Sequence, residues 1–311
     1  MKTVPIVFAF DNNLAFPAAV CISSLMMSAL DDTFYDIYVL HAATEILDKS
    51  YLNKVETYYN NCRINYREAP DTFKNGFEIR GITVAAYYRL LIPSLIPEYD
   101  RVIYSDVDVI FRQDLSDIYF NTDLEGCYIA GVNNLAHLDA DLKKHYGSTL
   151  GLDIRNVICS GFLLMDSKRI LADDLINEFI EQAKNKYKFQ DQDILNIVCQ
   201  NRIKMLAPKY SLLTYIYSMA VNNLDGLKEL WSENEINDAI SQGNIHYNGQ
   251  KPWKGYCVNF DIWWEYYRKS PIYDEKFYFD FFYKKLDEYD RLSLIKRIKI
   301  LARYFVYGKK N

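Results

Sequence analysis

The first seventy residues alternate between short apolar runs and longer segments with helical spacing. Residues 4–10, 36–41 and 63–67 form apolar or alternating runs, and each predicts a strand. The two segments between them, 17–30 and 48–59, carry apolar residues at the spacing of helices. This order, β-α-β-α-β, is typical of a parallel sheet covered by helices, which binds ligands beyond the carboxyl ends of its strands.

The stretch 101–111 is the strongest single signal in the chain. Its apolar, β-branched and aromatic residues predict a buried strand, and Asp106 and Asp108 interrupt it one residue apart. If the segment stays extended, the two carboxylates point the same way, about 6–7 Å apart. Two like charges at that separation favour a divalent cation between them. The alternative is that both acids only cap a turn at the end of the strand.

The downstream part of the chain predicts further elements by the same criteria. They are a helix over 83–92 closed by Pro93, a short helix over 115–120, strands over 128–132 and 158–166, a helix over 168–186 and a short strand over 244–247. The segment 133–156 is polar and irregular, and predicts a lid or acceptor-binding loop. Its two histidines, His137 and His145, are expected to be solvated.

Polar residues within these apolar elements are candidates for chemistry. Arg89 lies on the predicted helix 83–92, where it serves either as an ordinary salt-bridge partner or as a ligand contact. Gly161 lies within a predicted strand, where a ligand or another backbone can approach closely. Residues 190–193 read Gln-Asp-Gln-Asp before an apolar helix, and helix capping explains one of these acids but not both. Residues 246–253 bring together a His, a Gly, a Lys and a Trp, which suit metal binding, backbone access and a phosphate counter-charge.

Composition narrows the class of protein. The chain has 311 residues, half of them apolar, which is enough for one large α/β domain with an appendage. The net charge of −5 gives no sign of a nucleic-acid binder. Residues 294–311 carry six basic side chains and no acid, so the remainder of the chain carries −11.

Cysteine spacing and hydropathy indicate a reducing compartment and no membrane span. The six cysteines are scattered without CxxC spacing, which argues against a zinc site or a disulfide framework. No apolar run approaches 18 residues. The run at residues 4–10 is expected to be a first strand rather than a signal peptide.

Taken together, these motifs resemble glycosyltransferase family 8. The resemblance rests on Asp11, Arg89, Asp106-x-Asp108, the Gln-Asp-Gln-Asp of residues 190–193 and the His-Tyr-x-Gly-x-Lys-Pro-Trp block of residues 246–253, and it spans about residues 4–255. It implies an α/β GT-A fold, with a Rossmann-like, mostly parallel mixed sheet and helices on both faces. The expected organisation is a catalytic domain over 1–258, followed by a helical region over 259–311 with a basic amphipathic tail.

The resemblance also implies a role for each matching residue. Asp106, Asp108 and His246 correspond to the metal ligands, with Asp106 also near the ribose and the donor sugar. Asp11 corresponds to the residue that recognises uracil, and Asn13 is a further candidate for binding the UDP-sugar. Gly249 and Lys251 correspond to contacts of the pyrophosphate, and Arg89, Asp191 and Gln192 to residues around the anomeric carbon of the donor sugar. The family uses a UDP-linked sugar and retains anomeric configuration, so the implied activity moves glucose or galactose to a saccharide acceptor.

The chemistry of the metal ligands agrees with this assignment. A divalent cation and Lys251 would stabilise the charge that gathers on a departing diphosphate. The mixed oxygen and nitrogen ligands favour Mn²⁺ at least as much as Mg²⁺. Two positions depart from the family pattern and leave the donor open: Leu14 stands where an aromatic often stacks on uracil, and Cys159 where an Asn commonly contacts the donor sugar.

Retention of configuration is compatible with two mechanisms. A double displacement requires a nucleophile on the β face, and the matching residue is Gln192, whose amide is a poor nucleophile. In front-face attack the leaving phosphate itself receives the proton of the acceptor, and we favour this route.

The basic tail suggests where the acceptor is found. Residues 292–306 place apolar side chains at helical spacing among basic ones. They form either a surface helix packed on the domain or an interfacial helix drawn to anionic lipid. Similar tails occur in family members that glycosylate lipid-linked acceptors, which implies a glycolipid acceptor and a cytoplasmic protein at the inner face of the membrane.

Two other functions compete with this interpretation. A haloacid-dehalogenase-like phosphatase would use Asp106 as its nucleophile, but its Asp-x-Asp should follow the first strand, about 100 residues earlier. A non-catalytic nucleotide-sugar-binding protein on the same fold is the second, and the intact Asp106, Asp108 and His246 argue against it.

Overall fold

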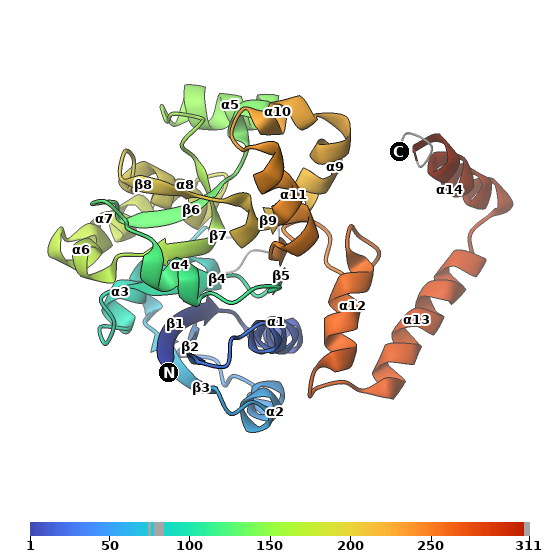
Figure 1. Cartoon of the computed structure of the whole chain (residues 1–311), viewed down its shortest axis with the longest axis horizontal. Helices are drawn as coiled ribbons and strands as arrows, with labels where there is room; N and C mark the ends of the chain where they lie inside the picture. Colours follow the sequence, from blue (N-terminus) through green and yellow to red (C-terminus); the bar gives the residue numbers. More distant parts are fainter. Residues whose placement is uncertain (74–75, 78–83, 308–311) are drawn as a thin grey trace.

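Seven strands form one sheet in the order β3-β2-β1-β4-β7-β6-β8 (Figure 1). They are β1 (Lys2–Ala9), β2 (Thr33–Ala42), β3 (Cys62–Ala69), β4 (Val102–Ser105), β6 (Ile129–Asn133), β7 (Ile158–Met165) and β8 (Ile203–Leu206). Only β7 runs antiparallel to its two neighbours; the other pairs are parallel. The computed structural model describes residues 1–73, 76–77 and 84–307, with side chains to residue 302. The predicted mixed, mostly parallel sheet is confirmed.

Alternate residues of the strands enter two apolar cores, one on each face of the sheet. In β1, Val4, Ile6 and Phe8 pack into one core and Val7 into the other, because successive side chains of a strand point to opposite faces. The first core includes α1 (Ala15–Met27), α2 (Ser50–Tyr58) and α4 (Ser116–Asn121), and helices nearer the C-terminus also enter it. The second core includes α3 (Ile92–Leu95), α6 (Ser167–Ala172), α7 (Leu175–Gln182) and α8 (Gln190–Val198). Helices on both faces are therefore also confirmed (Figure 1).

A second, three-stranded sheet corrects the prediction for residues 101–111. It consists of β5 (Val109–Ile110), β10 (Ile245–His246) and β9 (Leu212–Leu213), in that order. The chain leaves the large sheet after Ser105, bends through residues 106–108 and enters β5, which pairs antiparallel with β10. The prediction of one continuous strand is wrong because the small sheet offers β5 a different partner.

Two predicted helices differ from the structure. The described part of the predicted helix 83–92 is a 3₁₀ helix, η3 (Val84–Leu91), while residue 83 lies outside the described residues. Pro93 does not close this helix but lies in the first turn of α3, where a missing N–H costs little. The predicted helix 168–186 is divided between α6 and α7, because Asp174 adopts a left-handed conformation with φ 56°.

The predicted loop 133–156 folds into short helical turns and is anchored to the body. It contains η4 (Ala136–Leu138), α5 (Ala140–Lys143) and a π-helical turn, η5 (Lys144–Thr149). His137 and His145 are buried, so the expectation that both are solvated is wrong. Apolar residues of the same loop, such as Tyr146 and Leu152, pack into a small core of their own. Because the histidines lie next to these residues in sequence, they are buried with them.

The remaining elements complete the chain and lead to a C-terminal arm. They are α9 (Thr214–Asn222), α10 (Leu224–Lys228), α11 (Glu233–Gln242), α12 (Phe260–Lys269), α13 (Glu275–Asp290) and α14 (Leu294–Tyr307), besides the 3₁₀ turns η1 (Asn12–Leu14), η2 (Asp71–Phe73) and η6 (Pro208–Tyr210). Trp263 and Tyr267 of α12 pack against Phe16 of α1, with ring centroids 5.9 and 5.3 Å away.

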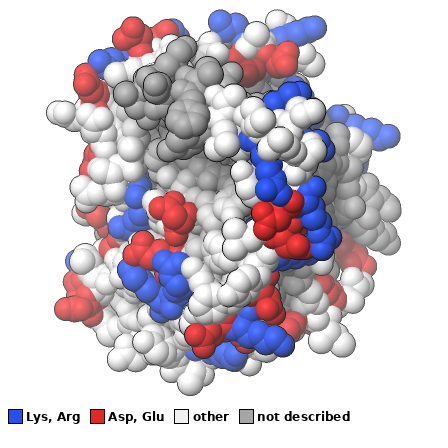
Figure 2. Space-filling model, turned by 90° about the vertical axis from the view of Figure 1, so that its right-hand side faces the viewer, with Lys and Arg blue, Asp and Glu red and all other residues white. Residues whose placement is uncertain are grey.

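Figure 1 shows α13 and α14 continuing outward, and Figure 2 shows basic and acidic side chains interspersed on this side. Within the described residues, none of the helices has the length and hydropathy needed to cross a membrane.

Candidate active site

Asp106, Asp108 and His246 converge at the carboxyl end of β4. Each offers one ligand atom, and these atoms lie within 4.8 Å of one another. The register of the small sheet brings His246 close to Asp108. His246 pairs with Val109, and the N–H of Tyr247 donates to the Asp108 carbonyl at 2.8 Å. Two acids and a histidine that are 138 residues apart in sequence (Asp108 to His246) are therefore joined by strand pairing.

Asp106 is held by one of its oxygens and free at the other. Its Oδ1 accepts hydrogen bonds from Arg89 Nη2 at 2.9 Å and from Tyr104 Oη at 2.7 Å. Its Oδ2 lies 3.7 Å from His246 Nε2. Tyr104 was not predicted as a site residue, although it precedes Asp106 by two positions and so shares its face of the strand.

Asp108 is enclosed by two cationic groups. Its Oδ2 accepts a hydrogen bond from Lys251 Nζ, which also donates to the Tyr247 carbonyl at 2.6 Å. Its Oδ1 is buried 3.3 Å from His246 Nε2 but accepts no well-aligned hydrogen bond. Burial alone would raise the pKa of Asp108, but the charges of Lys251 and His246 hold it well below its ordinary value. Burial likewise opposes protonation of His246, and the charge of Asp108 outweighs it and raises the His246 pKa to about 10.

The residues at this point fit a divalent cation. A β-carbon placed on Gly161 would collide with His246 Cε1 and would lie 2.7 Å from Asp106 Oδ2. The absence of a β-carbon at Gly161 therefore makes room for the His246 ring beside Asp106 Oδ2. Asp108 Oδ1, which is buried and accepts no hydrogen bond, is the kind of oxygen that a cation satisfies. Two carboxylates and one imidazole are a set of ligands that Mn²⁺ accepts readily.

Arg89 connects Asp106 to the first turn of α8. It is buried, with its guanidinium 4.4 Å from the centre of the Tyr104 ring. Its Nη1 donates to the carbonyl of Ser160 at 2.7 Å, and its Nε lies 3.2 Å from Asp191 Oδ2. Burial opposes the charged form, but Asp106 and Asp191 raise the Arg89 pKa above its ordinary value. Arg89 is thus a buried cation shared by two acids of the site, rather than a surface salt-bridge partner.

Asp191 and Gln192 begin α8 beside strand β7. Burial raises the pKa of Asp191 to about 6, against the opposing charge of Arg89. Asp191 Oδ2 accepts no hydrogen bond despite its burial. Gln192 Oε1 accepts a hydrogen bond from the N–H of Ser160 at 3.2 Å. These residues therefore lie on the same side of β7 as the Arg89 guanidinium.

A pocket of about 180 Å³ lies at the carboxyl ends of β1 and β2. It is lined by Phe10, Asp11, Ala42, Glu45, Val84, Ala85 and Tyr88. Asp11 Oδ1 accepts a hydrogen bond from the N–H of Asn13 at 3.0 Å, and Asn13 itself is exposed. Glu45, which accepts from the N–H of Asn12 at 3.0 Å, was not predicted here. Because β1 and β4 are adjacent parallel strands, this pocket and Asp106 share one edge of the sheet.

Gly249 is the one predicted residue for which the protein itself gives no packing reason. It is exposed, and a β-carbon placed there would meet no atom within 4 Å. A steric reason for glycine would have to come from a bound ligand.

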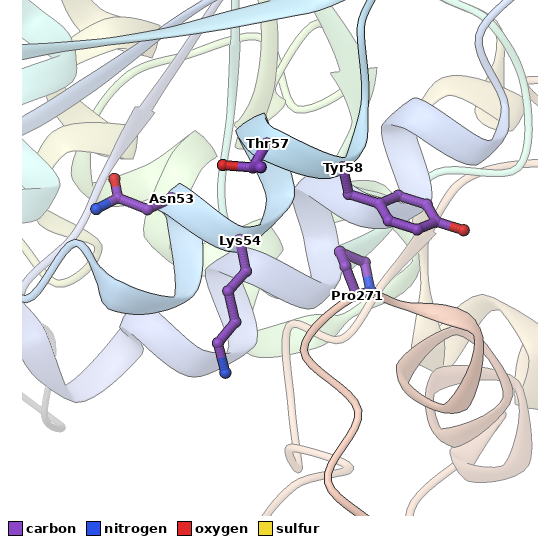
Figure 3. Close-up of a pocket in the computed structure, with 5 residues that line it drawn as sticks. All are labelled: Asn53, Lys54, Thr57, Tyr58 and Pro271. Carbon is purple, nitrogen blue, oxygen red and sulfur yellow. The ribbon is translucent and has the colours of Figure 1, made fainter.

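A larger hollow, of about 460 Å³, lies elsewhere on the surface (Figure 3). Asn53, Lys54, Thr57 and Tyr58 of α2 line it together with Pro271, which follows α12. It contains none of the predicted site residues, so its size does not make it the functional site.

Comparison with known proteins identifies relatives of the chain. A family model described as glycosyl transferase family 8 matches residues 5–257. Glycosyltransferase GlyF of Streptococcus pneumoniae is 27% identical over 84% of this chain and 60% of its own length. A lipopolysaccharide 1,2-glucosyltransferase of Escherichia coli is 24% identical over 87% of this chain and 79% of its own length. The chain thus spans about three fifths of GlyF, and also 63% of a Haemophilus influenzae relative.

Solved structures establish the fold. The galactosyltransferase LgtC, crystallised with donor and acceptor sugar analogues, superposes with a TM-score of 0.71 at 24% identity. The match covers 88% of this chain and 98% of LgtC. The large sheet, the helices on its two faces and the strand order therefore constitute a GT-A fold.

Proposed function

Because the chain belongs to glycosyltransferase family 8, we propose that it transfers glucose or galactose from a UDP-sugar to a saccharide acceptor, with retention of anomeric configuration. The acceptor we propose is a lipid-linked cell-surface glycan, by analogy with the Escherichia coli lipopolysaccharide glucosyltransferase. The observation that supports the proposal most is the convergence of Asp106, Asp108 and His246, whose candidate ligand atoms lie within 4.8 Å of one another.

We propose that Asp106, Asp108 and His246 hold a divalent cation, with Mn²⁺ at least as effective as Mg²⁺. When bound, the cation offsets the negative charge that gathers on the departing diphosphate. The Lys251 ammonium, which pairs with Asp108, supplies a second positive charge beside the proposed metal site, where the diphosphate would bind. Gly249, in the same exposed turn, leaves backbone accessible to phosphate oxygens.

The pocket at the ends of β1 and β2 supports a place for the nucleotide base. We propose that Asp11 and Asn13 bind uracil there, with Glu45 fixing the loop through its bond to the N–H of Asn12. Asp106 follows β4, the neighbour of β1, and shares Arg89 with Asp191 of α8, so we propose that the ribose and the donor sugar extend past it. Leu14 is half-buried and aliphatic, so this position gives the uracil no aromatic ring on which to stack.

The proposed reaction is a substitution at the anomeric carbon. The bond to the UDP phosphate oxygen breaks, a bond to the acceptor oxygen forms on the same face, and the acceptor proton passes to the departing phosphate oxygen. Asp191 stabilises the positive charge that develops on the sugar, and Arg89 orients Asp191 and Asp106. Gln192 remains the candidate nucleophile of the alternative double displacement, for which an amide is poorly suited.

A panel of UDP-sugars tests the proposed function. Glucose, galactose and their N-acetyl forms are offered with Mn²⁺ and a saccharide acceptor, and release of UDP is measured. We expect metal-dependent release with one hexose donor. Turnover of p-nitrophenyl phosphate without UDP release would instead favour the phosphatase, and donor binding without release would favour the non-catalytic binding protein.

The acid limb of the pH profile tests the role of Asp191. The carboxylate is the form that can stabilise a cationic sugar, and with a pKa of about 6 it is populated above pH 6 and lost below it. We therefore expect kcat/KM for the donor to fall as the pH drops through about 6. The profile is measured at two high Mn²⁺ concentrations, because proton competition at the metal ligands would shift the limb with Mn²⁺ whereas titration of Asp191 would not. A profile that stays flat down to about pH 5 would contradict this role.

The C-terminal helix supports a place at the membrane. Leu294 and Ile295 of α14 are 72% and 67% exposed, so these side chains do not pack on the domain. We propose that α14 binds anionic lipid at the inner face of the plasma membrane, with the catalytic unit, residues 1–258, in the cytoplasm and residues 259–311 as its helical extension. All six cysteines are free, as a reducing compartment requires.

Removing residues 292–311 is expected to weaken binding to anionic vesicles. Each basic residue near such a surface contributes about 1 kcal/mol, so binding should also fall as salt is raised. Replacing Lys296, Arg297 and Lys299 by Glu should have the same effect, whereas the matched replacement of the exposed Lys2, Lys54 and Lys168 should not. Vesicle sedimentation measures both, and binding unaffected by the deletion would exclude an interfacial α14.

A further inference from the structure

Two adjacent side chains of the loop between β6 and β7 hold two nearby side chains of α8. His145 and Tyr146 lie in the π-helical turn η5, and both are buried. His145 Nε2 is 2.8 Å from Asp193 Oδ2. Gln192 Nε2 donates to Tyr146 Oη at 2.6 Å. π-Helical turns are rare and occur frequently at functional sites, so this turn and its partners are candidates for a role in the reaction.

The Gln192 amide is fixed at both ends. Its oxygen accepts from the N–H of Ser160 on β7, and its nitrogen donates to the Tyr146 phenol. A glutamine side chain has three rotatable bonds, so a single hydrogen bond through its oxygen would leave the amide free to tilt and rotate. The second hydrogen bond removes that freedom. Burial raises the pKa of the Tyr146 phenol far above its ordinary value, so the phenol stays neutral.

The first turn of α8 depends on this support, because its own start is irregular. Gln190 adopts a left-handed conformation with φ 46°, which costs free energy in a residue other than glycine. The residue before it, Phe189, has no side chain that could cap the helix, and Asp193 accepts its N–H at 3.0 Å instead. The Phe189 ring stacks on Tyr146 with centroids 6.0 Å apart and planes 13° apart. The loop therefore packs against and hydrogen-bonds the same turn that presents Asp191 and Gln192.

We propose that Tyr146 is a positioning residue that fixes the Gln192 amide toward the anomeric carbon of the donor, and thereby controls the rate of sugar transfer. The proposal rests on the proposed function, since it assumes that Gln192 flanks the donor sugar. Tyr146 itself does not touch the substrate; it acts through Gln192. Its loss changes the orientation of an amide rather than the binding surface, so it lowers kcat and leaves KM for the donor nearly unchanged.

The test is a double-mutant cycle between Tyr146 and Gln192. Tyr146→Phe removes the hydroxyl and keeps the ring stacked on Phe189. We expect kcat to fall about tenfold, the order of effect that a small misplacement of a reacting group produces, with KM for the UDP-sugar unchanged within about twofold. In a Gln192→Ala background, which should itself retain measurable transfer, Tyr146→Phe should have no further effect on kcat. Gln192→Asn, whose amide is one methylene too short to reach Tyr146, should reproduce the loss with Tyr146 intact.

Tyr35→Phe is the matched control. Tyr35 is also fully buried, and its hydroxyl donates to Asp114 and accepts from the N–H of Leu115 near the amino end of β2, at the opposite edge of the sheet from the site. It should lower the melting temperature without changing kcat. A kcat unchanged by Tyr146→Phe, or lowered equally with and without Gln192, would overturn the proposal while the proposed function stands. A wild-type protein that releases UDP from no donor would contradict the proposed function, and this proposal with it.

Discussion

Replacing Asp108 with alanine is expected to abolish sugar transfer, with a loss of about a thousandfold or more in rate. Asp108 makes three different contributions to the site. Its Oδ1 is buried without a hydrogen-bond donor, its Oδ2 accepts from Lys251, and its carbonyl accepts the N–H that follows His246. In the metal-free protein, loss of the carboxylate would leave Lys251 and protonated His246 without their shared counter-charge. In the metal-bound protein, where the His246 ring is neutral, the cation would lose one of three ligands.

Metal binding by itself separates this loss from a loss of folding. In the wild-type protein Mn²⁺ should raise the melting temperature, because a ligand that binds only the folded state stabilises it. Asp108→Ala should remove that increase. Asp100→Ala, which removes an exposed carboxylate shortly before β4, should keep both the increase and the activity.

Gln192→Ala, in contrast to Asp108→Ala, should retain measurable transfer. Equal and complete loss of transfer in Asp108→Ala and Gln192→Ala would indicate a direct chemical role for Gln192.

Adding one methyl group at Gly161 is expected to lower the affinity for Mn²⁺ by about a hundredfold, the upper range for changes that displace metal ligands. The β-carbon of alanine would collide with the ring of His246 and would lie 2.7 Å from Asp106 Oδ2. His246 is buried, so its ring cannot turn away without displacing its neighbours. The methyl group thus separates two ligands without removing either.

The measurement for Gly161→Ala is Mn²⁺ binding followed by electron paramagnetic resonance, which needs no turnover. Gly255→Ala is the control, because the space beside Gly255 is open and its backbone is not left-handed. Wild-type affinity in Gly161→Ala would mean that the cation does not lie in the space between His246 and Asp106, and would refute the arrangement proposed for the ligands.

Local patterns predicted most elements of the large sheet, because their signals are contained in short windows, but they missed β8. β1, β2 and β3 and the helices between them follow from apolar runs and helical spacing alone. The neighbouring positions of Asp11 and Asp106 follow in turn, since parallel strands end at one edge of the sheet. The family resemblance, confirmed by the match over residues 5–257, supplied the pairing of His246 with the acids.

Features that depend on distant partners were not predicted. Asp106 and Asp108 allowed a turn at the end of the strand, but nothing local showed that the chain then enters a second sheet, because β5 is as buried as β4 and only its pairing with β10 separates them. The burial of His145 depends on Asp193, which lies 48 residues away. Tyr104 is different: its position two residues before Asp106 was visible in the sequence and could have identified it.

The central claim is that one cation is held jointly by Asp106, Asp108 and His246 while it binds the diphosphate of UDP. The most direct measurement is a crystal structure of the protein with Mn²⁺ and UDP, in which the anomalous signal locates the manganese. We expect one manganese peak bound by the two carboxylates, the imidazole of His246 and oxygens of the pyrophosphate. A structure with UDP bound but no manganese at this point, or with His246 turned away from it, would rule out a cation held jointly by these three residues.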